Sequence, residues 1–234
     1  VLGYPTFEQS MKIIEAMVNG GVDLMELQIP FSEPIADGPV ILSANQKALA
    51  GGVSVSRCID FAGQVSRNFP IPFLFMSYYN VLFRYGIAGF ASAMAETRIQ
   101  GAIVPDLPPE EGEEYLKAMA ERNLDPIFIY SPTTSPDRMK YIASFAGGFI
   151  YCIARKGVTG ANTDFSEQLQ DYLTKCRQST DLPLALGFGV KDKNDIDFLR
   201  GKVDIAVIGT QTIRLVEQER SEEHTSELQS LLII

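Results

Sequence analysis

Short apolar runs alternate with amphipathic segments along most of the chain. Seven runs are almost continuously hydrophobic: residues 24–29, 72–78, 102–105, 126–130, 149–154, 183–187 and 204–208. Such runs are typical of parallel strands that are covered on both faces. The pattern therefore predicts seven strand–helix units, and Val1-Leu2 is interpreted as the tail of an eighth strand placed first.

Polar and proline residues ahead of the amphipathic segments indicate where helices begin. Thr6 with Gln9 makes a plausible capping box. The segment Pro-Pro-Glu-Glu at 108–111 suits a helix start, with proline near the first turn and acids at the positive end of the helix dipole. Asp164 and Asp192 mark two further starts, and a last helix is expected near residue 211.

Repeating β-then-α units indicate a parallel sheet. Eight units favour a closed (β/α)8 barrel, an α/β fold of the TIM-barrel type, over an open doubly wound sheet. Periodicity does not show whether a sheet closes, so the open sheet stays an alternative at this stage. No linker divides residues 1–219, which are predicted to form one catalytic barrel domain, incomplete at both termini.

The hydrophobic periodicity stops at residue 220. The segment RSEEHTSELQS (220–230) resembles the translation of a common sequencing adapter. Residues 220–234 are therefore predicted to be a non-native tail outside the fold. This tail contains His224, the only histidine, so acid–base chemistry in residues 1–219 falls to carboxylates, tyrosines or lysines.

Composition excludes several classes of partner. The net charge is −9, which argues against nucleic acid, because phosphate backbones need a basic footprint. Backbone amides can still hold a small phosphorylated substrate. No apolar run approaches the roughly 18 residues of a membrane span. The three cysteines, Cys58, Cys152 and Cys176, show no zinc or redox spacing, and are predicted to be reduced thiols of a cytoplasmic protein.

Two carboxylates stand where parallel strands of a barrel carry chemistry. Glu26 lies inside an apolar strand, and if Leu27 and Ile29 face the helices, alternation points Glu26 and Gln28 into the barrel. A low-dielectric interior would raise the pKa of Glu26 toward neutrality, as a proton donor needs. The alternative is a buried glutamate held by backbone donors. Asp37 follows in a Pro/Gly-rich loop, where aspartate is also a common turn former.

Glycines follow three consecutive predicted strands. They lie in the loop 155–160, in the Gly-Phe-Gly sequence at 187–189, and in Gly209-Thr210 ahead of the last helix. Glycines in these units together with a helix N-terminus predict a phosphate site. The alternative is that each glycine only marks a loop.

The stretch ELQIPFSEPIADGP (26–39) closely resembles the signature of the tryptophan synthase alpha subunit, usually written LELGxPFSDPxADGP. The resemblance extends from Val1 to about Glu219. It continues through Met76–Asn80, Val104–Pro108, Ser131–Thr134, Arg155–Gly160, Gly187–Gly189 and Gly209-Thr210.

The resemblance implies a lyase that cleaves indole-3-glycerol phosphate to indole and glyceraldehyde 3-phosphate in L-tryptophan biosynthesis. It implies no metal and no organic cofactor, and a pyridoxal-phosphate beta subunit as partner in an alpha2beta2 heterotetramer. The catalytic positions fall on Glu26, Asp37 and Tyr151. The phosphate-binding positions fall on Gly160, Gly189, Gly209 and Thr210. The substrate pocket and mobile loop fall on Met76, Ile129, Arg155, Gly157, Thr159 and Phe188.

Two positions depart from the signature. Gln28 replaces the usual glycine and adds a side chain next to Glu26. Glu33 replaces the usual aspartate near the surface that family members present to the beta subunit. Two rival functions stay open: another barrel enzyme acting on a phosphorylated indole or sugar, and a catalytically idle barrel that serves as an allosteric partner.

Overall fold

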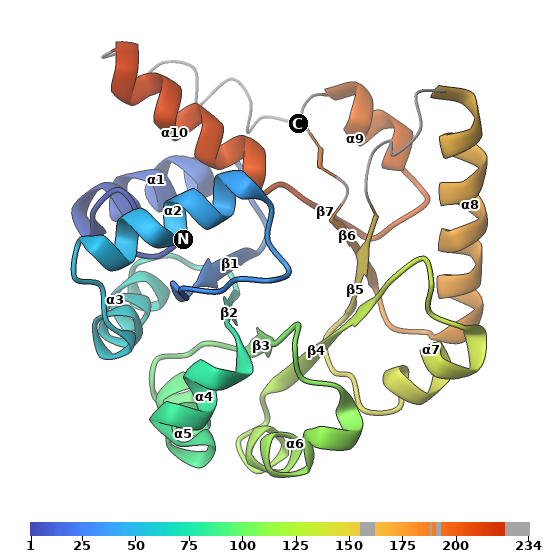
Figure 1. The fold of residues 1–234 in the computed structure, drawn as a ribbon, viewed down its shortest axis with the longest axis horizontal. Helices are drawn as coiled ribbons and strands as arrows, with labels where there is room; N and C mark the ends of the chain where they lie inside the picture. Colours follow the sequence, from blue (N-terminus) through green and yellow to red (C-terminus); the bar gives the residue numbers. More distant parts are fainter. Residues whose placement is uncertain (155–161, 188, 191–192, 223–234) are drawn as a thin grey trace. The chain divides into compact units, whose positions relative to one another are not determined.

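A computed structural model describes residues 1–154, 162–187, 189–190 and 193–222, without the side chains of 162–166 and 220–222 (Figure 1). The chain divides into two compact units. Among the described residues, the first unit comprises Val1–Pro126 and Ile213–Glu222, and the second lies within Ile127–Thr212. Each unit repeats the strand–helix alternation that the apolar pattern predicts.

The first unit contains three parallel strands. Its elements are α1 (Phe7–Asn19), β1 (Met25–Gln28), α2 (Pro39–Ala50), α3 (Val55–Asn68), β2 (Phe73–Met76), α4 (Tyr79–Tyr85), α5 (Ile87–Glu96), β3 (Gly101–Ile103), the 3-10 helix η1 (Pro109–Glu111) and α6 (Glu113–Ala120). β2 lies between β1 and β3, and Gln28 is the register partner of Met76.

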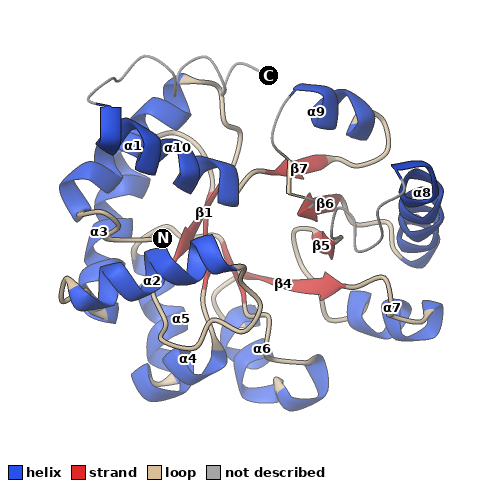
Figure 2. Ribbon diagram, turned by 45° about the horizontal axis from the view of Figure 1, so that its top comes forward, coloured by secondary structure: helices blue, strands red, loops and turns tan. Residues whose placement is uncertain are grey.

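The second unit contains the remaining strands, also parallel and paired in chain order. Its elements are β4 (Asp125–Tyr130), which starts at the boundary, α7 (Pro136–Ala143), β5 (Ile150–Ile153), α8 (Asn162–Ser179), β6 (Leu184–Gly187), α9 (Lys193–Leu199), β7 (Ile205–Val207) and the start of α10 (Thr210–Glu222). Figure 2 shows α7 and α8 on the same side of β4 and β5.

The apolar side chains of the first unit gather between its strands and helices. Phe73 and Phe75 of β2 are fully buried and join one core cluster with Cys58 of α3 and Met94 of α5. Burying a large apolar side chain of this kind contributes roughly 1.5–3 kcal/mol. This packing fixes β1, which carries Glu26, and its neighbour β2.

Helix starts follow the sequence signals in part. The side chain of Thr6 accepts a hydrogen bond from the backbone N–H of Gln9 at 3.2 Å, which confirms the predicted N-cap of α1. The predicted helix at 108–111 is only the short η1, because Gly112 separates it from α6. Helix α8 begins at Asn162, two residues before the predicted Asp164.

The prediction of an eighth strand at Val1-Leu2 is wrong for the described chain. These residues form no strand, although the N–H of Leu2 donates to the carbonyl of Gln28 at 2.8 Å, as an added strand would. A single backbone hydrogen bond does not define a strand. At the other end, the predicted domain boundary after residue 219 falls inside α10, and residues 223–234 lie outside the described chain.

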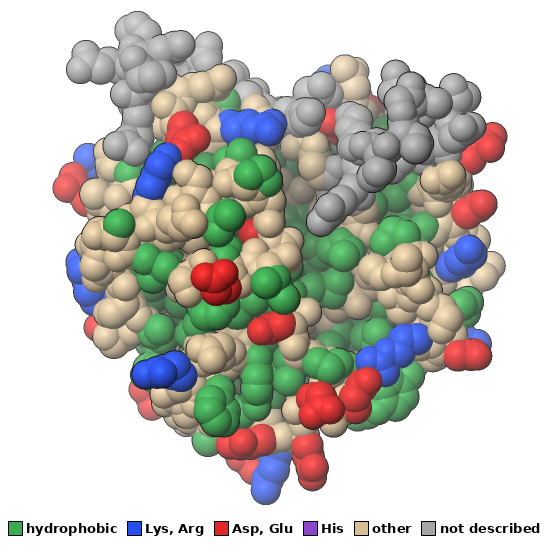
Figure 3. Space-filling model, in the orientation of Figure 1, with side chains coloured by type: hydrophobic (Ala, Val, Ile, Leu, Met, Phe, Trp, Pro, Cys, Tyr) green, Lys and Arg blue, Asp and Glu red, His purple; other side chains and the backbone are tan. Residues whose placement is uncertain are grey.

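Acidic side chains gather over η1 and α6 at the bottom of the view in Figure 3. Both short helices carry an acidic pair in their first turn, Glu110-Glu111 in η1 and Glu113-Glu114 in α6. These four carboxylates contribute to the net charge of −9. Among the helices that the structure describes, none is long and apolar enough to cross a membrane.

Candidate active site

Glu26 and Gln28 share one face of β1. Met25, Leu27 and Ile29 belong to the core cluster that packs against the helices. Since strand side chains alternate between faces, Glu26 and Gln28 project from the opposite face. The prediction that both side chains lie on the face of β1 opposite the helices is therefore confirmed.

Asp37 lies in the loop between β1 and α2, at the end of a turn in which its N–H donates to the Pro34 carbonyl at 2.9 Å. Its carboxylate receives two hydrogen bonds on the same oxygen. Gln28 Nε2 donates to Asp37 Oδ2 at 2.6 Å, and Tyr78 Oη donates to Oδ2 at 3.0 Å. Asp37 is therefore both a turn residue and part of a polar cluster with Gln28 and Tyr78.

Tyr78 fixes the loop that carries Asp37. It is fully buried at the N-cap of α4, and its hydroxyl accepts a hydrogen bond from the Ala36 N–H at 3.1 Å. Its ring stacks on Phe31 with centroids 5.2 Å apart. The sequence reasoning assigned Tyr78 no role. Tyr78 lies two residues after Met76, a predicted pocket residue. Since side chains two positions apart in an extended segment share a face, this spacing could have identified Tyr78 as a site residue.

The two carboxyl groups have different environments. Burial, with a further contribution from the nearby charge of Asp37, raises the pKa of Glu26 to about 7. Burial also raises the pKa of Asp37, but the hydrogen bonds from Gln28 and Tyr78 oppose that rise. A carboxylate that accepts two donors is stabilised in its charged form. Glu26 can therefore hold a proton near neutral pH, and the two hydrogen bonds favour the ionised form of Asp37.

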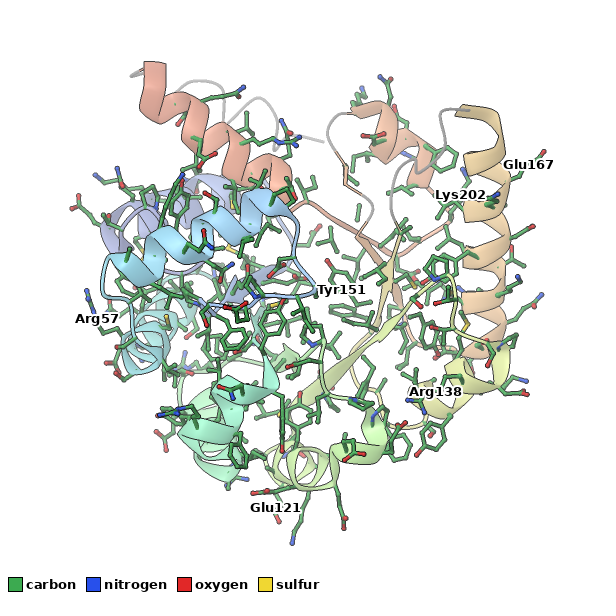
Figure 4. All side chains as sticks on the ribbon, in the orientation of Figure 1. Arg57, Glu121, Arg138, Tyr151, Glu167 and Lys202 are labelled. Atoms are coloured by element: carbon green, nitrogen blue, oxygen red, sulfur yellow. The ribbon has the colours of Figure 1, made fainter. Side chains whose placement is uncertain are left out.

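Tyr151 lies on β5 in the second unit, where it is the register partner of Ile129 on β4. Its neighbour Cys152 interacts with Cys176 of α8, so alternation turns the Tyr151 side chain away from that helix. Figure 4 shows Tyr151 apart from the outward-pointing side chains of α7 and α8. The Tyr151 ring packs on Gly187, the last residue of β6.

The predicted phosphate residues are described in part. Gly189 is exposed with φ +73°, a conformation that favours glycine. Gly209 is exposed immediately before α10, and Thr210 is the first residue of that helix, so free backbone N–H groups are available there. The remaining predicted residues lie outside the described chain: Arg155, Gly157, Thr159, Gly160 and Phe188.

Metal-ligating side chains do not cluster in the part of the chain that the structure describes, where no group of three or more His, Cys, Asp or Glu residues is suitably placed. The polar groups around Asp37 are instead hydrogen-bond donors and acceptors. The arrangement suits proton transfer and charge stabilisation by side chains.

Known proteins resemble this chain over almost its whole length. A sequence model of the tryptophan synthase alpha chain family matches residues 1–233. The chain belongs to the tryptophan synthase alpha chain family. The tryptophan synthase alpha chain of Desulforapulum autotrophicum is 62% identical over 231 residues, which cover 99% of this chain and 91% of that protein.

Solved structures of tryptophan synthase and of its alpha subunit agree with this family assignment. Tryptophan synthase subunit alpha from Legionella pneumophila matches with a TM-score of 0.90 and 28% identity, covering 99% of this chain and 87% of that one. The aminoacrylate-bound form of tryptophan synthase from M. tuberculosis matches with a TM-score of 0.87 and 27% identity, with the same coverage.

These likenesses decide between the alternatives that the sequence left open. The fold is of the TIM-barrel type found in tryptophan synthase alpha chains rather than an open sheet, and the described residues contribute seven of its strands. As a tryptophan synthase alpha chain, the protein is a carbon–carbon lyase that cleaves indole-3-glycerol phosphate to indole and glyceraldehyde 3-phosphate in tryptophan biosynthesis.

Proposed function

We propose that Glu26 is the proton donor of this cleavage and that Asp37 stabilises the charge that develops on the indole ring. Indole is a poor leaving group as a carbanion. Protonation of its C3 gives an indoleninium ion, which accepts the electrons of the breaking carbon–carbon bond. The reaction therefore needs an acid near C3, a negative charge near the ring nitrogen, and a base for the side-chain hydroxyl.

The observation that carries this proposal is the raised pKa of Glu26, about 7, beside a carboxylate with two hydrogen-bond donors. Glu26 donates its proton to C3 and, once ionised, accepts the proton of the substrate hydroxyl. Asp37 accepts a hydrogen bond from the ring N–H and stabilises the cation. Two carboxyl groups in different environments, one buried and the other accepting two hydrogen bonds, support such opposite roles.

The second unit supplies the proposed phosphate contacts. Backbone N–H groups at Gly189, Gly209 and Thr210 would hold the phosphate, aided by the N-terminus of α10. Tyr151 would line the indole site or help to place the acid, together with Met76 and Ile129. Closure of the loop 155–160 would exclude water. No step of this scheme requires a metal or an organic cofactor.

We also infer a beta-subunit partner, in an alpha2beta2 heterotetramer. Ile35 and Phe83 are large hydrophobic residues that are 80% and 65% exposed. They belong to one region of the first unit, because the bond from Ala36 to Tyr78 ties the loop of Ile35 to the start of α4. Exposed apolar side chains grouped in this way are typical of protein interfaces. Three free, buried cysteines fit a cytoplasmic location.

The lyase assignment is tested by indole release from indole-3-glycerol phosphate, measured with and without a beta subunit. We expect turnover by the chain alone and faster turnover with the partner. If the chain releases no indole in either setting, it is an idle barrel and the proposed roles fail.

The interface is tested by co-sedimentation of the Ile35→Glu variant with the beta subunit. We expect weaker association than for Tyr141→Glu, which places the same charge at another exposed hydrophobic residue, on α7. Equal binding of both variants would exclude the Ile35 region as the interface.

A further inference from the structure

We propose that Gln28 is a positioning residue of this lyase, whose side-chain amide holds the Asp37 carboxylate in the orientation that receives the indole N–H. The inference rests on the proposed role of Asp37. It starts from a departure from the family signature, since Gln28 stands where glycine is usual and a glycine has no side chain to offer.

The backbone of Gln28 is fixed on two sides. Its carbonyl accepts a hydrogen bond from Leu2 at 2.8 Å, and the next N–H, that of Ile29, donates to Met76 at 2.9 Å. Gln28 as a whole residue is 8% exposed. A donor mounted on a buried strand can place its partner more accurately than one on a loop. Gln28 therefore links the loop that carries Asp37 to the strand β1.

Both donors to Asp37 bind the same oxygen. Gln28 Nε2 and Tyr78 Oη contact Oδ2 at 2.6 Å and 3.0 Å, and no donor in the described chain contacts Oδ1. Two donors from different elements, β1 and the start of α4, resist rotation of the carboxylate. Oδ1 is thereby left as the oxygen that can accept the ring N–H of the substrate. A single donor, as in a chain with glycine at position 28, would leave this rotation less restrained.

The hydrogen bonds also set the charge of Asp37. An ionised carboxylate only accepts hydrogen bonds, and both Gln28 and Tyr78 donate. The titratable side chains that face Asp37 are Glu26 and Tyr78. Burial raises the pKa of Asp37, and the Gln28 bond lowers it. Loss of that bond should therefore raise the pKa of Asp37.

The test is the Gln28→Met variant, which keeps the length of the side chain but has no donor. Its matched control is Gln64→Met, at an exposed position on α3. Steady-state indole release is measured from pH 5 to pH 9 for both. For Gln28→Met we expect a loss in kcat on the order of 10-fold, the usual size for one hydrogen bond to a charged group. The acid limb of its kcat profile should move to higher pH, while the alkaline limb, set by Glu26, stays in place. Gln64→Met should match the wild type.

Wild-type kcat and an unchanged acid limb in Gln28→Met would overturn the proposal and make Gln28 a space-filling residue. If Gln28→Met does not fold, Gln28→Asn keeps the polarity but withdraws the amide from Asp37, and the same two readouts apply. Asp37→Asn separates this inference from the proposed function. If Asp37→Asn is inactive while Gln28→Met is normal, only the role of Gln28 fails. If Asp37→Asn retains full activity, the role of Asp37 fails, and the inference fails with it.

Discussion

The ring of Tyr151 lies against the Cα of Gly187, so closely that a Cβ on Gly187 would stand 2.8 Å from the tyrosine hydroxyl oxygen. Both residues belong to paired strands, since β5 and β6 run parallel with Ile153 opposite Gly187. The backbone of the two paired strands therefore cannot easily move apart. The absence of a side chain at Gly187 determines where the Tyr151 ring can lie.

Gly187→Ala should displace the Tyr151 ring and lower kcat roughly 10- to 100-fold, because small misplacements of catalytic groups have effects of this size. Gly89→Ala is the control, since a Cβ there would meet only the Tyr85 ring at 3.8 Å. Steady-state kinetics of both variants give the comparison. If the contact with the Tyr151 ring causes the loss, Gly187→Ala should lower kcat much less when Tyr151 has already been replaced by alanine. Equal losses in both backgrounds would assign the effect to the backbone of β6.

Gly189→Asp should weaken substrate binding, seen as a raised KM, because it places a negative charge where the phosphate is proposed to bind. Any side chain at Gly189 is also strained by its φ of +73°. Gly201→Asp controls for this strain, since Gly201 has φ +75° and, like Gly189, open space around its Cα. A KM that rises equally in both variants would remove Gly189 from the phosphate site.

The raised pKa of Glu26 should make stability depend on pH. The pKa rises from an ordinary value of 4.5 to about 7 in the folded protein. The folded protein therefore incurs no penalty below pH 4.5, an increasing penalty between pH 4.5 and 7, and the full penalty above pH 7. The shift corresponds to at most about 3 kcal/mol.

Glu26→Gln removes this penalty, so it should be stabilised relative to the wild type at pH 8 but not at pH 5. Urea unfolding at the two pH values measures the difference. A stability difference between the two proteins that is the same at both pH values would show that Glu26 is not protonated in the folded state at neutral pH.

Much of the fold could be predicted from the sequence, because strands covered on both faces leave apolar runs with sharp ends. The predicted run at 183–187 corresponds to β6 (Leu184–Gly187), and the run at 126–130 to β4 (Asp125–Tyr130). The inward orientation of Glu26 also followed from alternation alone. The supposed strand at Val1-Leu2 failed because two apolar residues do not distinguish a strand from a buried turn.

The connections of Asp37 could not be predicted in this way. Alternation predicted the face of Gln28 but not its partner, and its amide contacts a carboxylate nine positions later. Tyr78 reaches the same oxygen from the start of α4. These bonds depend on the path of the loop between β1 and α2 and on side-chain rotamers, and hydrophobic periodicity carries no information on either.

The most direct test of the central claim, that Glu26 donates the proton that releases indole, is kcat of indole release by Glu26→Gln. The matched control is Glu8→Gln, at an exposed glutamate in the first turn of α1 that pairs with Lys12. The account predicts a loss in kcat of roughly 10²- to 10⁴-fold for Glu26→Gln, with KM little changed, and wild-type kinetics for Glu8→Gln. Near-normal turnover by Glu26→Gln would contradict it.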